Sequence, residues 1–335
     1  MMFPKCMIGR LPFVNVHGQL MPCCWLDTPR YNTNGNIPSS RGMVHNIFND
    51  ITFSLHERAY AELISSDDWA MALERLYIEQ YHMCGMKCGD FAVIDGKPSW
   101  NEFEIDDHIQ TGTMQRSTDI NLFNKHIIEP SEIRSIQLEL TNRCSLKCQY
   151  CVRQSDRPKH TQLAMSIVED VLMSKQWEHI EDVGNYGDTM FYSKYHDFLG
   201  VLEHAAVDWY SGHFAATGRG KSWWDVTIDK YDRVIKSGTG VRLTFGIDGL
   251  SDTSKLHRIG QDWDEITYGM RKAIDVGCVV FWQFIPMSFN EEQIDKAREL
   301  AERWGAKFQV HTSSRFHRND PNKPTNKRLY RERHE

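Results

Sequence analysis

Three cysteines lie within eight residues of one another in the stretch LELTNRCSLKCQYC, which ends at Cys151. Three residues separate Cys144 from Cys148, and two separate Cys148 from Cys151. Thiolates are soft ligands that select zinc, copper(I) or iron-sulfur clusters. A structural zinc site normally takes four protein ligands, whereas three thiolates on a four-iron cluster leave one iron open. The spacing therefore favours an iron-sulfur cluster with an open iron, where a substrate or cofactor can bind.

Eight of the nine cysteines precede residue 152, so the thiols are concentrated in the first half of the chain. In a reducing compartment, clustered thiols indicate metal binding or catalysis rather than a disulfide framework. A second metal site could use four of them, with Cys24 as a rival to Cys23; the four are Cys6, Cys23, Cys84 and Cys88. Zinc and an iron-sulfur cluster both suit four cysteines, so both stay open. Cys278 lies in an apolar stretch and is expected to be a buried core thiol.

From about Ser135 onward, short apolar runs alternate with helical patterns. The runs that we interpret as strands are Ile136–Leu140, Ile180–Asn185, His213–Thr217, Val241–Ile247, Cys278–Ile285 and Lys307–Thr312. The helix candidates are Gln162–Gln176, Tyr195–Ala206, Ser222–Lys236, Asp262–Val276 and Asn290–Trp304, the last with Asn290 as its N-cap. Six strand-helix units predict an α/β fold with a partial (β/α)6 TIM-like barrel. A doubly wound open sheet would give nearly the same pattern.

The first ninety residues predict a small, cysteine-rich α+β domain. The stretch LPFVNVHGQLMPCCW alternates apolar and polar residues around His17 and Gly18, which predicts a hairpin. Ile51–Ile64 and Trp69–Tyr81 look helical, the second with Ser66 or Asp67 as its cap. We expect residues 1–90 to form this domain, 91–131 a linker with a turn near Pro98, 132–316 the barrel and 317–335 a basic C-terminal tail.

Composition and charge exclude several classes of protein. Hydrophobic residues make up 41% and charged residues 25% of the chain, as in ordinary globular proteins. There is no apolar run near the ~20 residues that span a bilayer and no secretory signal, so we expect a cytoplasmic protein. A net charge of -6 argues against general nucleic-acid binding. The basic stretch after Arg318 is typical of a solvated tail.

The three-cysteine motif, with aromatic Tyr150 before its last cysteine and the strand-like run IQLEL ahead of it, resembles the signature of radical S-adenosylmethionine (radical SAM) enzymes. The resemblance implies that Cys144, Cys148 and Cys151 hold a catalytic 4Fe-4S cluster whose fourth iron binds S-adenosylmethionine. One electron would then cleave that molecule to methionine and a 5'-deoxyadenosyl radical, which abstracts a substrate hydrogen. A donor such as flavodoxin or ferredoxin is implied as the electron source. The resemblance covers about Ile136 to Ser314.

Two further motifs resemble parts of the same family that bind S-adenosylmethionine. NYGDTM resembles the Gly-Gly-Glu motif, which receives the amino group of the cofactor; its candidates are Tyr186, Gly187 and Asp188. Asp188 is one methylene shorter than the usual Glu. FGIDGLSDTSKLHRIG resembles the fourth-strand Ser-Ile-Asp-Gly motif with a following Arg, which makes Asp248 and Arg258 candidates for cofactor binding. Here Gly246 stands in place of the serine.

Gln283 is a further candidate for cofactor binding, because it could face the barrel interior; a polar residue satisfied within the sheet is the alternative. Apart from Gln283, the candidate cofactor-binding residues follow the C-terminal ends of predicted strands, where barrel folds build their active sites.

The N-terminal pattern Cys6-x11-Gly18-x4-Cys23, followed later by Cys84-x3-Cys88, resembles the SPASM and Twitch auxiliary-cluster modules of radical SAM enzymes. In those families the module follows the barrel, whereas here it precedes it. The resemblance implies one auxiliary 4Fe-4S cluster, with a zinc knuckle as the alternative.

Together these resemblances imply an oxidoreductase or transferase that modifies a peptide or protein. A small-molecule substrate such as a nucleotide or sugar is the alternative within the enzyme class. A non-catalytic module that binds an iron-sulfur cluster or zinc is the alternative outside it.

Overall fold

The computed structural model describes residues 12–24, 27, 51–79, 93–94, 97–98, 129–156, 158–313 and 315–331. The chain divides into two compact units, residues 1–138 and 139–335. Cys6, Cys84 and Cys88 lie outside the described residues.

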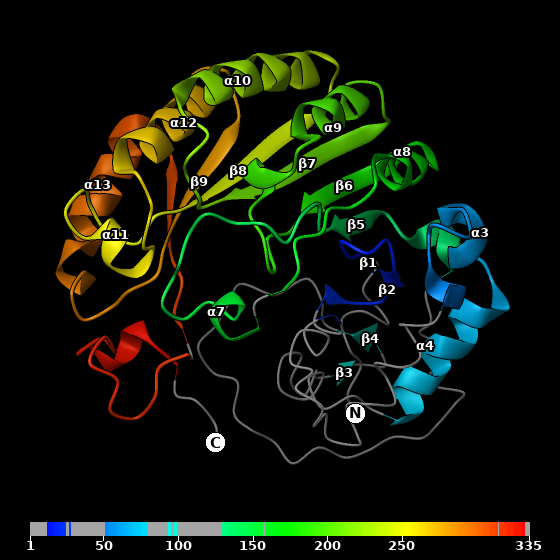
Figure 1. The fold of residues 1–335 in the computed structure, drawn as a ribbon, viewed down its shortest axis with the longest axis horizontal. Coiled ribbons are helices and arrows are strands. Elements are labelled where there is room, and N and C mark those ends of the chain that lie inside the picture. Colours follow the sequence, from blue (N-terminus) through cyan, green and yellow to red (C-terminus); the bar gives the residue numbers. More distant parts are fainter. Residues whose placement is uncertain are drawn as a thin grey trace. The chain divides into compact units, whose positions relative to one another are not determined.

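The second unit is built on a row of parallel strands (Figure 1). These strands are β6 (Trp177–Asp182), β7 (Val207–Phe214), β8 (Gly240–Gly246), β9 (Val279–Phe284) and β10 (Lys307–Val310). They are hydrogen-bonded in the order of the sequence, β6-β7-β8-β9-β10. A doubly wound sheet reverses its strand order at a switch point and carries helices on both faces. The unbroken order is that of a partial barrel, which confirms the predicted α/β fold class.

Helices follow the strands of the second unit in alternation. The main helices are α8 (Met165–Met173), α9 (Tyr195–Leu202), α10 (Lys221–Lys236), α12 (Trp263–Asp275) and α13 (Ile294–Trp304). The shorter ones are α7 (Arg153–Asp156), η5 (Thr189–Phe191), α11 (Ser254–His257), η6 (Glu291–Gln293) and η7 (Lys327–Leu329). Figure 1 shows α9, α10, α12 and α13 along one side of the strands.

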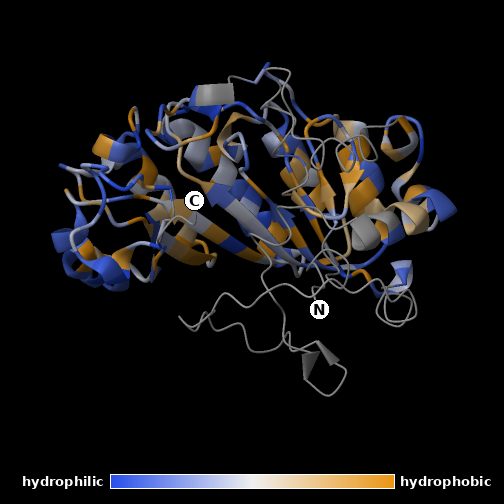
Figure 2. Ribbon diagram, turned by 90° about the horizontal axis from the view of Figure 1, so that it is seen from below, coloured by the Kyte–Doolittle hydropathy of each residue, from blue (hydrophilic) through white to orange (hydrophobic). Residues whose placement is uncertain are grey.

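The strands carry both hydrophobic and hydrophilic residues (Figure 2), and buried and more exposed positions alternate along β9. In β9, Val280, Trp282 and Phe284 are buried, whereas Phe281 and Gln283 are half-buried. The alternation shows that one face of β9 is more exposed than the other.

Two strands begin earlier than the sequence predicts. β6 begins at Trp177 rather than Ile180, and β7 at Val207 rather than His213, because charged residues interrupt the apolar run after the first residue of each strand. β7 also ends before the predicted Thr217, because Ala215 and Ala216 donate their backbone N–H groups to the Asp188 carboxylate instead of to a strand.

The starts of two helices can be compared with the capping residues that the sequence offers. Asp262 caps α12, since its carboxylate accepts a hydrogen bond from the N–H of Glu265 at 2.8 Å. Asn290 lies at the N-cap position of η6, which leads directly into α13, but its side chain makes no capping hydrogen bond. Its side chain instead donates to the carbonyl oxygens of Asp248 and Ile285, both at 3.1 Å, and α13 begins only at Ile294.

The first unit contains the predicted hairpin, made of β1 (Phe13–Val14) and β2 (Leu20–Met21). Gly18 has φ 71°, in the left-handed region that a glycine adopts without strain. The side-chain oxygen of Asn15 accepts from the N–H groups of His17 and Gln19, both at 3.0 Å, and so fixes the turn. β5 (Ser135–Leu138), which corresponds to the first predicted strand of the barrel, pairs in parallel with β1.

The helical prediction for Ile51–Ile64 is only partly correct. η3 (Ile51–Phe53) and α3 (Tyr60–Ile64) are separated by residues that pair elsewhere: Ser54 forms a β-bridge with Gln19. α4 (Asp67–Glu79) begins after Ser66, whose hydroxyl accepts from Trp69 N–H as predicted for a cap.

The remaining described elements of the first unit are β3 (Val93–Ile94), β4 (Lys97–Pro98) and η4 (Pro130–Glu132). None of the helices in the described part of the chain is long and apolar enough to cross a bilayer.

Candidate cofactor site

The three cysteines of the motif lie together on one irregular loop of the second unit. Cys144, Cys148 and Cys151 are half-buried and none forms a disulfide with another described residue. The loop is closed locally, since Cys151 N–H donates to the carbonyl oxygen of Cys148 at 3.1 Å. Burial raises the pKa of the Cys144 thiol to about 12 and that of the Cys148 thiol to about 11. Without a metal both are therefore neutral thiols, and coordination would replace their protons.

Hydrogen bonds join this cysteine loop to the segments that follow β6, β7 and β8. After β6, Asp188 N–H donates to Arg143 O at 2.9 Å. After β7, Thr217 O accepts from Ser145 Oγ at 2.7 Å. After β8, Ile259 O accepts from Lys147 N–H at 2.9 Å and His257 O accepts from Gln149 N–H at 3.4 Å. Segments far apart in the sequence thus meet at the carboxyl ends of the parallel strands. In barrel folds this end carries the active site.

The segment that resembles the Gly-Gly-Glu motif passes directly behind the cysteine loop. A Cβ on Gly187 would lie 1.9 Å from the carbonyl oxygen of Thr141, so only glycine fits there. Tyr186 is buried, and its N–H donates to the carboxylate of Glu139 at 2.8 Å. Glu139, which is fully buried, was not identified from the sequence.

Asp188 is also buried, and its carboxylate accepts backbone hydrogen bonds. Oδ1 accepts from Met190 N–H at 3.1 Å, and Oδ2 accepts from Ala215 and Ala216 N–H at 2.7 and 2.8 Å. Burial raises the pKa of Asp188, and these N–H groups oppose that rise. Because each carboxylate oxygen offers about two lone-pair sites, only Oδ1 keeps an acceptor site for another donor.

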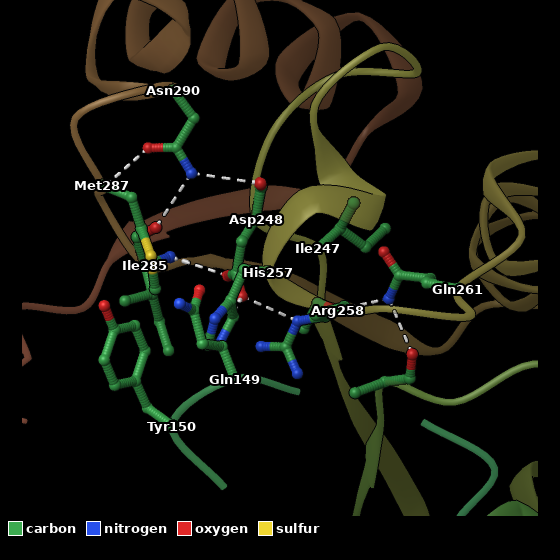
Figure 3. Close-up of polar contacts among 12 residues, drawn as sticks. Gln149, Tyr150, Ile247, Asp248, His257, Arg258, Gln261, Ile285, Met287 and Asn290 are labelled. Atoms are coloured by element: carbon green, nitrogen blue, oxygen red, sulfur yellow. Dashed lines mark hydrogen bonds and ion pairs between the residues drawn. The ribbon is translucent and has the colours of Figure 1, made fainter. Parts of the chain in front are cut away.

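Asp248 and Arg258, the two other charged candidates, form a buried ion pair (Figure 3). Asp248 Oδ1 accepts from Ile285 N–H at 2.8 Å, and Asp248 Oδ2 lies 2.8 Å from Arg258 Nε. This second contact is an ion pair rather than an aligned hydrogen bond. The guanidinium also acts on the cysteine loop: burial raises the pKa of Cys148, and the charge of Arg258 lowers it.

The glycine that replaces the expected serine makes room for this arginine. A Cβ on Gly246 would lie 2.6 Å from Nη2 and 2.8 Å from Cζ of Arg258. The guanidinium therefore occupies the space that a serine side chain would need at the end of β8.

His257 approaches the same oxygen of Asp248 as Arg258 does, with Nε2 3.8 Å from Oδ2. Burial lowers the pKa of His257 to about 4, so the ring is uncharged at neutral pH. The ring of Tyr150 stacks on that of His257, with centroids 5.7 Å apart and planes inclined by 25°. Tyr150, the aromatic residue of the cysteine motif, is thus linked to Asp248 through His257.

Gln283 lies on the half-buried face of β9. Its amide nitrogen lies 2.9 Å from His311 Nδ1, so its polar group is satisfied between β9 and the segment after β10. Cys278 is buried, as expected of a core thiol.

Two buried side chains that fasten the strand ends were missed by sequence reasoning. Gln261 Nε2 donates to the carbonyl oxygens of Ala215 at 2.6 Å and Gly246 at 2.9 Å, which ties the end of β7 to the end of β8. The Glu265 carboxylate accepts from three consecutive backbone N–H groups, at Gly218, Arg219 and Gly220. No motif in the sequence signals either contact.

The structure describes only part of the N-terminal cysteine set. Cys23 and Cys24 are both half-buried on the segment after β2, and the other three members lie outside the described residues. Across the described ranges, no three His, Cys, Asp or Glu side chains converge on a site for a single metal ion.

Comparison with known proteins gives one relative in sequence and several in structure. No protein-family model matches the chain. It is 25% identical over 183 residues to a probable GTP 3',8-cyclase from Methanococcus maripaludis, a match that covers 53% of this chain and 58% of that protein. The chain therefore spans less than two thirds of that relative.

Solved structures with similar folds include SuiB from Streptococcus suis bound to S-adenosylmethionine, at 12% identity and a TM-score of 0.44, over 58% of this chain and 44% of SuiB. SuiB bound to its precursor peptide SuiA matches at 11% identity and a TM-score of 0.43, over 71% of this chain and 52% of SuiB. The cobalamin-dependent S-adenosylmethionine radical enzyme OxsB matches at 15% identity and a TM-score of 0.34, over 50% of this chain and 25% of OxsB.

The cysteine motif and the sequential parallel sheet agree with the resemblance to the radical SAM superfamily. Members of this superfamily hold a 4Fe-4S cluster on three cysteines and bind S-adenosylmethionine at it. The residues of this chain fit that group: three half-buried cysteines without disulfides lie on one loop, beside a buried arginine that can pair with a carboxylate.

Proposed function

We propose that this protein is a radical SAM enzyme that cleaves S-adenosylmethionine reductively and abstracts a hydrogen atom from a peptide or protein substrate. When bound, the 4Fe-4S cluster supplies the electron and the open iron for that cleavage. The observation that carries the proposal is the set of hydrogen bonds between the cysteine loop and the segments that carry Asp188, Thr217, His257 and Ile259. They bring three separate motifs to one end of the sheet.

In this proposal the protein side chains bind and orient the cofactor. Arg258 pairs with the cofactor carboxylate, because its planar guanidinium can contact Asp248 and a second carboxylate together. Asp188 Oδ1 accepts from the cofactor amino group, since it keeps one acceptor site. Tyr186 and Gly187 contribute backbone to the same wall, and Tyr150 contributes its ring. Gln283, on the half-buried face of β9, is a further candidate contact for the cofactor.

The N-terminal cysteines are proposed to hold an auxiliary 4Fe-4S cluster within residues 1–90, ahead of a linker (91–131) and the barrel (132–316). Its ligands would be Cys6, Cys23, Cys84 and Cys88. An auxiliary cluster of this kind supports the choice of a peptide substrate. A cytoplasmic location and a flavodoxin or ferredoxin donor complete the proposal.

A nucleotide substrate is the second candidate, and the sequence match to a probable GTP 3',8-cyclase favours it. The two candidates differ in what must accelerate cofactor cleavage. A nucleoside triphosphate should raise the rate of 5'-deoxyadenosine formation if the second is correct, and a candidate peptide should do so if the first is.

The decisive experiment is anaerobic reconstitution with iron and sulfide, followed by reduction and measurement of 5'-deoxyadenosine from added S-adenosylmethionine. We expect product from the wild-type protein and none from Cys148→Ala. If a fully reconstituted wild-type sample forms no 5'-deoxyadenosine, the chain is a non-catalytic cluster-binding module.

Iron and zinc analysis of the same sample tests the auxiliary site. Because a 4Fe-4S cluster contains four irons, two clusters give about eight irons per chain, whereas one cluster and a zinc knuckle give about four with one zinc. Replacing Cys84 with alanine should remove the second metal and leave the first.

A further inference from the structure

The segment after β10 packs against the cysteine loop although it lies some 170 residues further along the chain. The basic run in it predicts a solvated tail, but residues 315–331 make specific contacts. Tyr150 Oη donates to Asp320 Oδ1 at 2.6 Å. Asn322 Nδ2 donates to Gln149 Oε1 at 3.0 Å and lies 3.2 Å from Tyr150 Oη. Arg315 Nη1 donates to the carbonyl oxygen of Tyr150 at 3.1 Å.

These contacts fix the tyrosine at both ends. The hydroxyl is held by Asp320 and Asn322, and the main chain is held by Arg315. The ring lies between His257 on one side and Phe316, in an edge contact with centroids 5.4 Å apart, on another. Phe316 is 4% exposed, so this part of the segment is anchored in the protein rather than resting on its surface.

The segment is itself fastened to the rest of the unit at several points. Ser288 N–H donates to Asn322 O at 3.0 Å, and Ser288 Oγ donates to Pro321 O at 2.8 Å. Farther along, Thr325 Oγ1 donates to Glu291 Oε1 at 2.6 Å. Asp320 accepts a further hydrogen bond from Asn322 N–H at 3.0 Å, which orients its carboxylate toward the tyrosine. The acceptor for Tyr150 is therefore preorganised.

We propose that Asp320 is a positioning residue of the cofactor site: it acts through Tyr150 to hold the aromatic wall of the cysteine loop against His257, where bound S-adenosylmethionine would contact it. This inference rests on the proposed function. It assigns a role in cofactor binding to the C-terminal segment, which the radical SAM motifs do not include. Asp320 itself does not touch the cofactor.

The test compares binding of S-adenosylmethionine to reconstituted, unreduced full-length protein by equilibrium dialysis. Losing the hydrogen bond to a charged acceptor should weaken binding about tenfold in Asp320→Ala and in Tyr150→Phe. If Asp320 acts only through the tyrosine hydroxyl, the double variant should bind no more weakly than Tyr150→Phe alone. Asp320→Asn, which keeps an acceptor oxygen, should recover most of the affinity.

Thr325→Val is the matched control, because it removes one hydrogen bond of the same segment away from Tyr150. It should leave both cofactor affinity and iron content at wild-type values. The electron paramagnetic resonance signal of the reduced cluster, recorded with and without cofactor, gives a second readout. The change on cofactor addition should be altered in Asp320→Ala and Tyr150→Phe but not in Thr325→Val.

Two results would overturn the inference: wild-type affinity in Asp320→Ala, or equal losses in Asp320→Ala and Thr325→Val. Additive losses in the double variant would also contradict action through Tyr150. Failure of the proposed function is distinguishable from these, because the wild-type protein would then not bind S-adenosylmethionine at all.

Discussion

The position of the Arg258 guanidinium leaves no room for a side chain at Gly246. A Cβ at position 246 would lie 2.6 Å from the guanidinium, which is held by its buried pairing with Asp248. Moving the guanidinium aside would separate two buried charges, and that is costly. The glycine that departs from the family pattern is therefore a consequence of where the arginine lies.

Gly246→Ser should weaken binding of S-adenosylmethionine about tenfold, since overpacking a tight site costs on the order of 1–3 kcal/mol. Equilibrium dialysis measures the effect. Gly200→Ser is the control, because the nearest atom to a Cβ there is Lys230 Nζ at 4.0 Å. Unchanged affinity in Gly246→Ser would show that Arg258 does not have to stay in place.

Arg258→Met should destabilise the fold by about 3 kcal/mol, because it leaves the Asp248 carboxylate buried without its cation. Chemical denaturation measures the loss. Adding Asp248→Asn should restore much of the stability, since no buried charge then remains. A double variant as unstable as the single one would mean that the pair matters for its shape and not for its charge.

At the scale of elements, side chains and not strand pairing hold the loops at the carboxyl ends of β7 and β8. Gln261 bridges the two strand ends, and Glu265 at the start of α12 gathers the N–H groups of residues 218–220. Gly218 has φ 113° and Gly220 φ 78°, so both lie in the left-handed region that favours glycine. The loop that contacts the cysteine motif through Thr217 is thus held in its conformation by the carboxylate of Glu265 in α12.

Glu265→Gln should loosen this loop and cost about 2 kcal/mol, because an amide has one acceptor oxygen and turns an NH2 group toward backbone donors. Hydrogen exchange should speed up at residues 218–220, with little change in α9. Glu302→Gln, on the neighbouring helix α13, is a suitable control. Exchange at wild-type rates would show that backbone geometry alone keeps the loop in place.

For the whole molecule, one buried carboxyl makes stability depend on pH. Asp182 at the end of β6 accepts from the Thr189 hydroxyl and is approached by Tyr210 Oη at 3.5 Å, from β7. Tyr210 continues to Tyr195 at 2.9 Å, and Tyr195 to Tyr231 at 2.6 Å. Burial raises the pKa of Asp182 to about 7. Burial therefore favours the protonated carboxyl, while the hydrogen bonds from Thr189 and Tyr210 oppose protonation.

Because the folded-state pKa lies above the unfolded value of about 4, the folded state binds the additional proton between these values. The contribution of Asp182 to stability is then fully present below pH 4 and is lost as the pH rises to 7, by at most about 1.4 kcal/mol per unit. Asp182→Asn should remove this slope. Melting temperatures of both proteins from pH 5 to 7.5 measure it, and parallel curves would contradict the raised pKa.

The sequence by itself predicted the type of metal site and determined the class of fold. Ligand type and spacing are local properties, so the three-cysteine motif and its cluster could be predicted without a structure, as could the parallel strand-helix alternation and the hairpin at Gly18. Periodicity could not choose between a barrel and a doubly wound sheet. The order in which the strands pair decides that, and pairing is a long-range contact.

Only the tertiary structure decided how the site residues are held. Asn290 has the sequence position of a helix cap, yet its side-chain amide donates to the carbonyl oxygens of Asp248 and Ile285, after β8 and β9. The fold brings these carbonyl oxygens within hydrogen-bond distance of the buried amide. Asp320 read as one charge in a basic tail, yet it accepts from Tyr150, which is far away in sequence. The partner of a side chain depends on which segments meet in space, and short-range sequence patterns do not predict such long-range contacts.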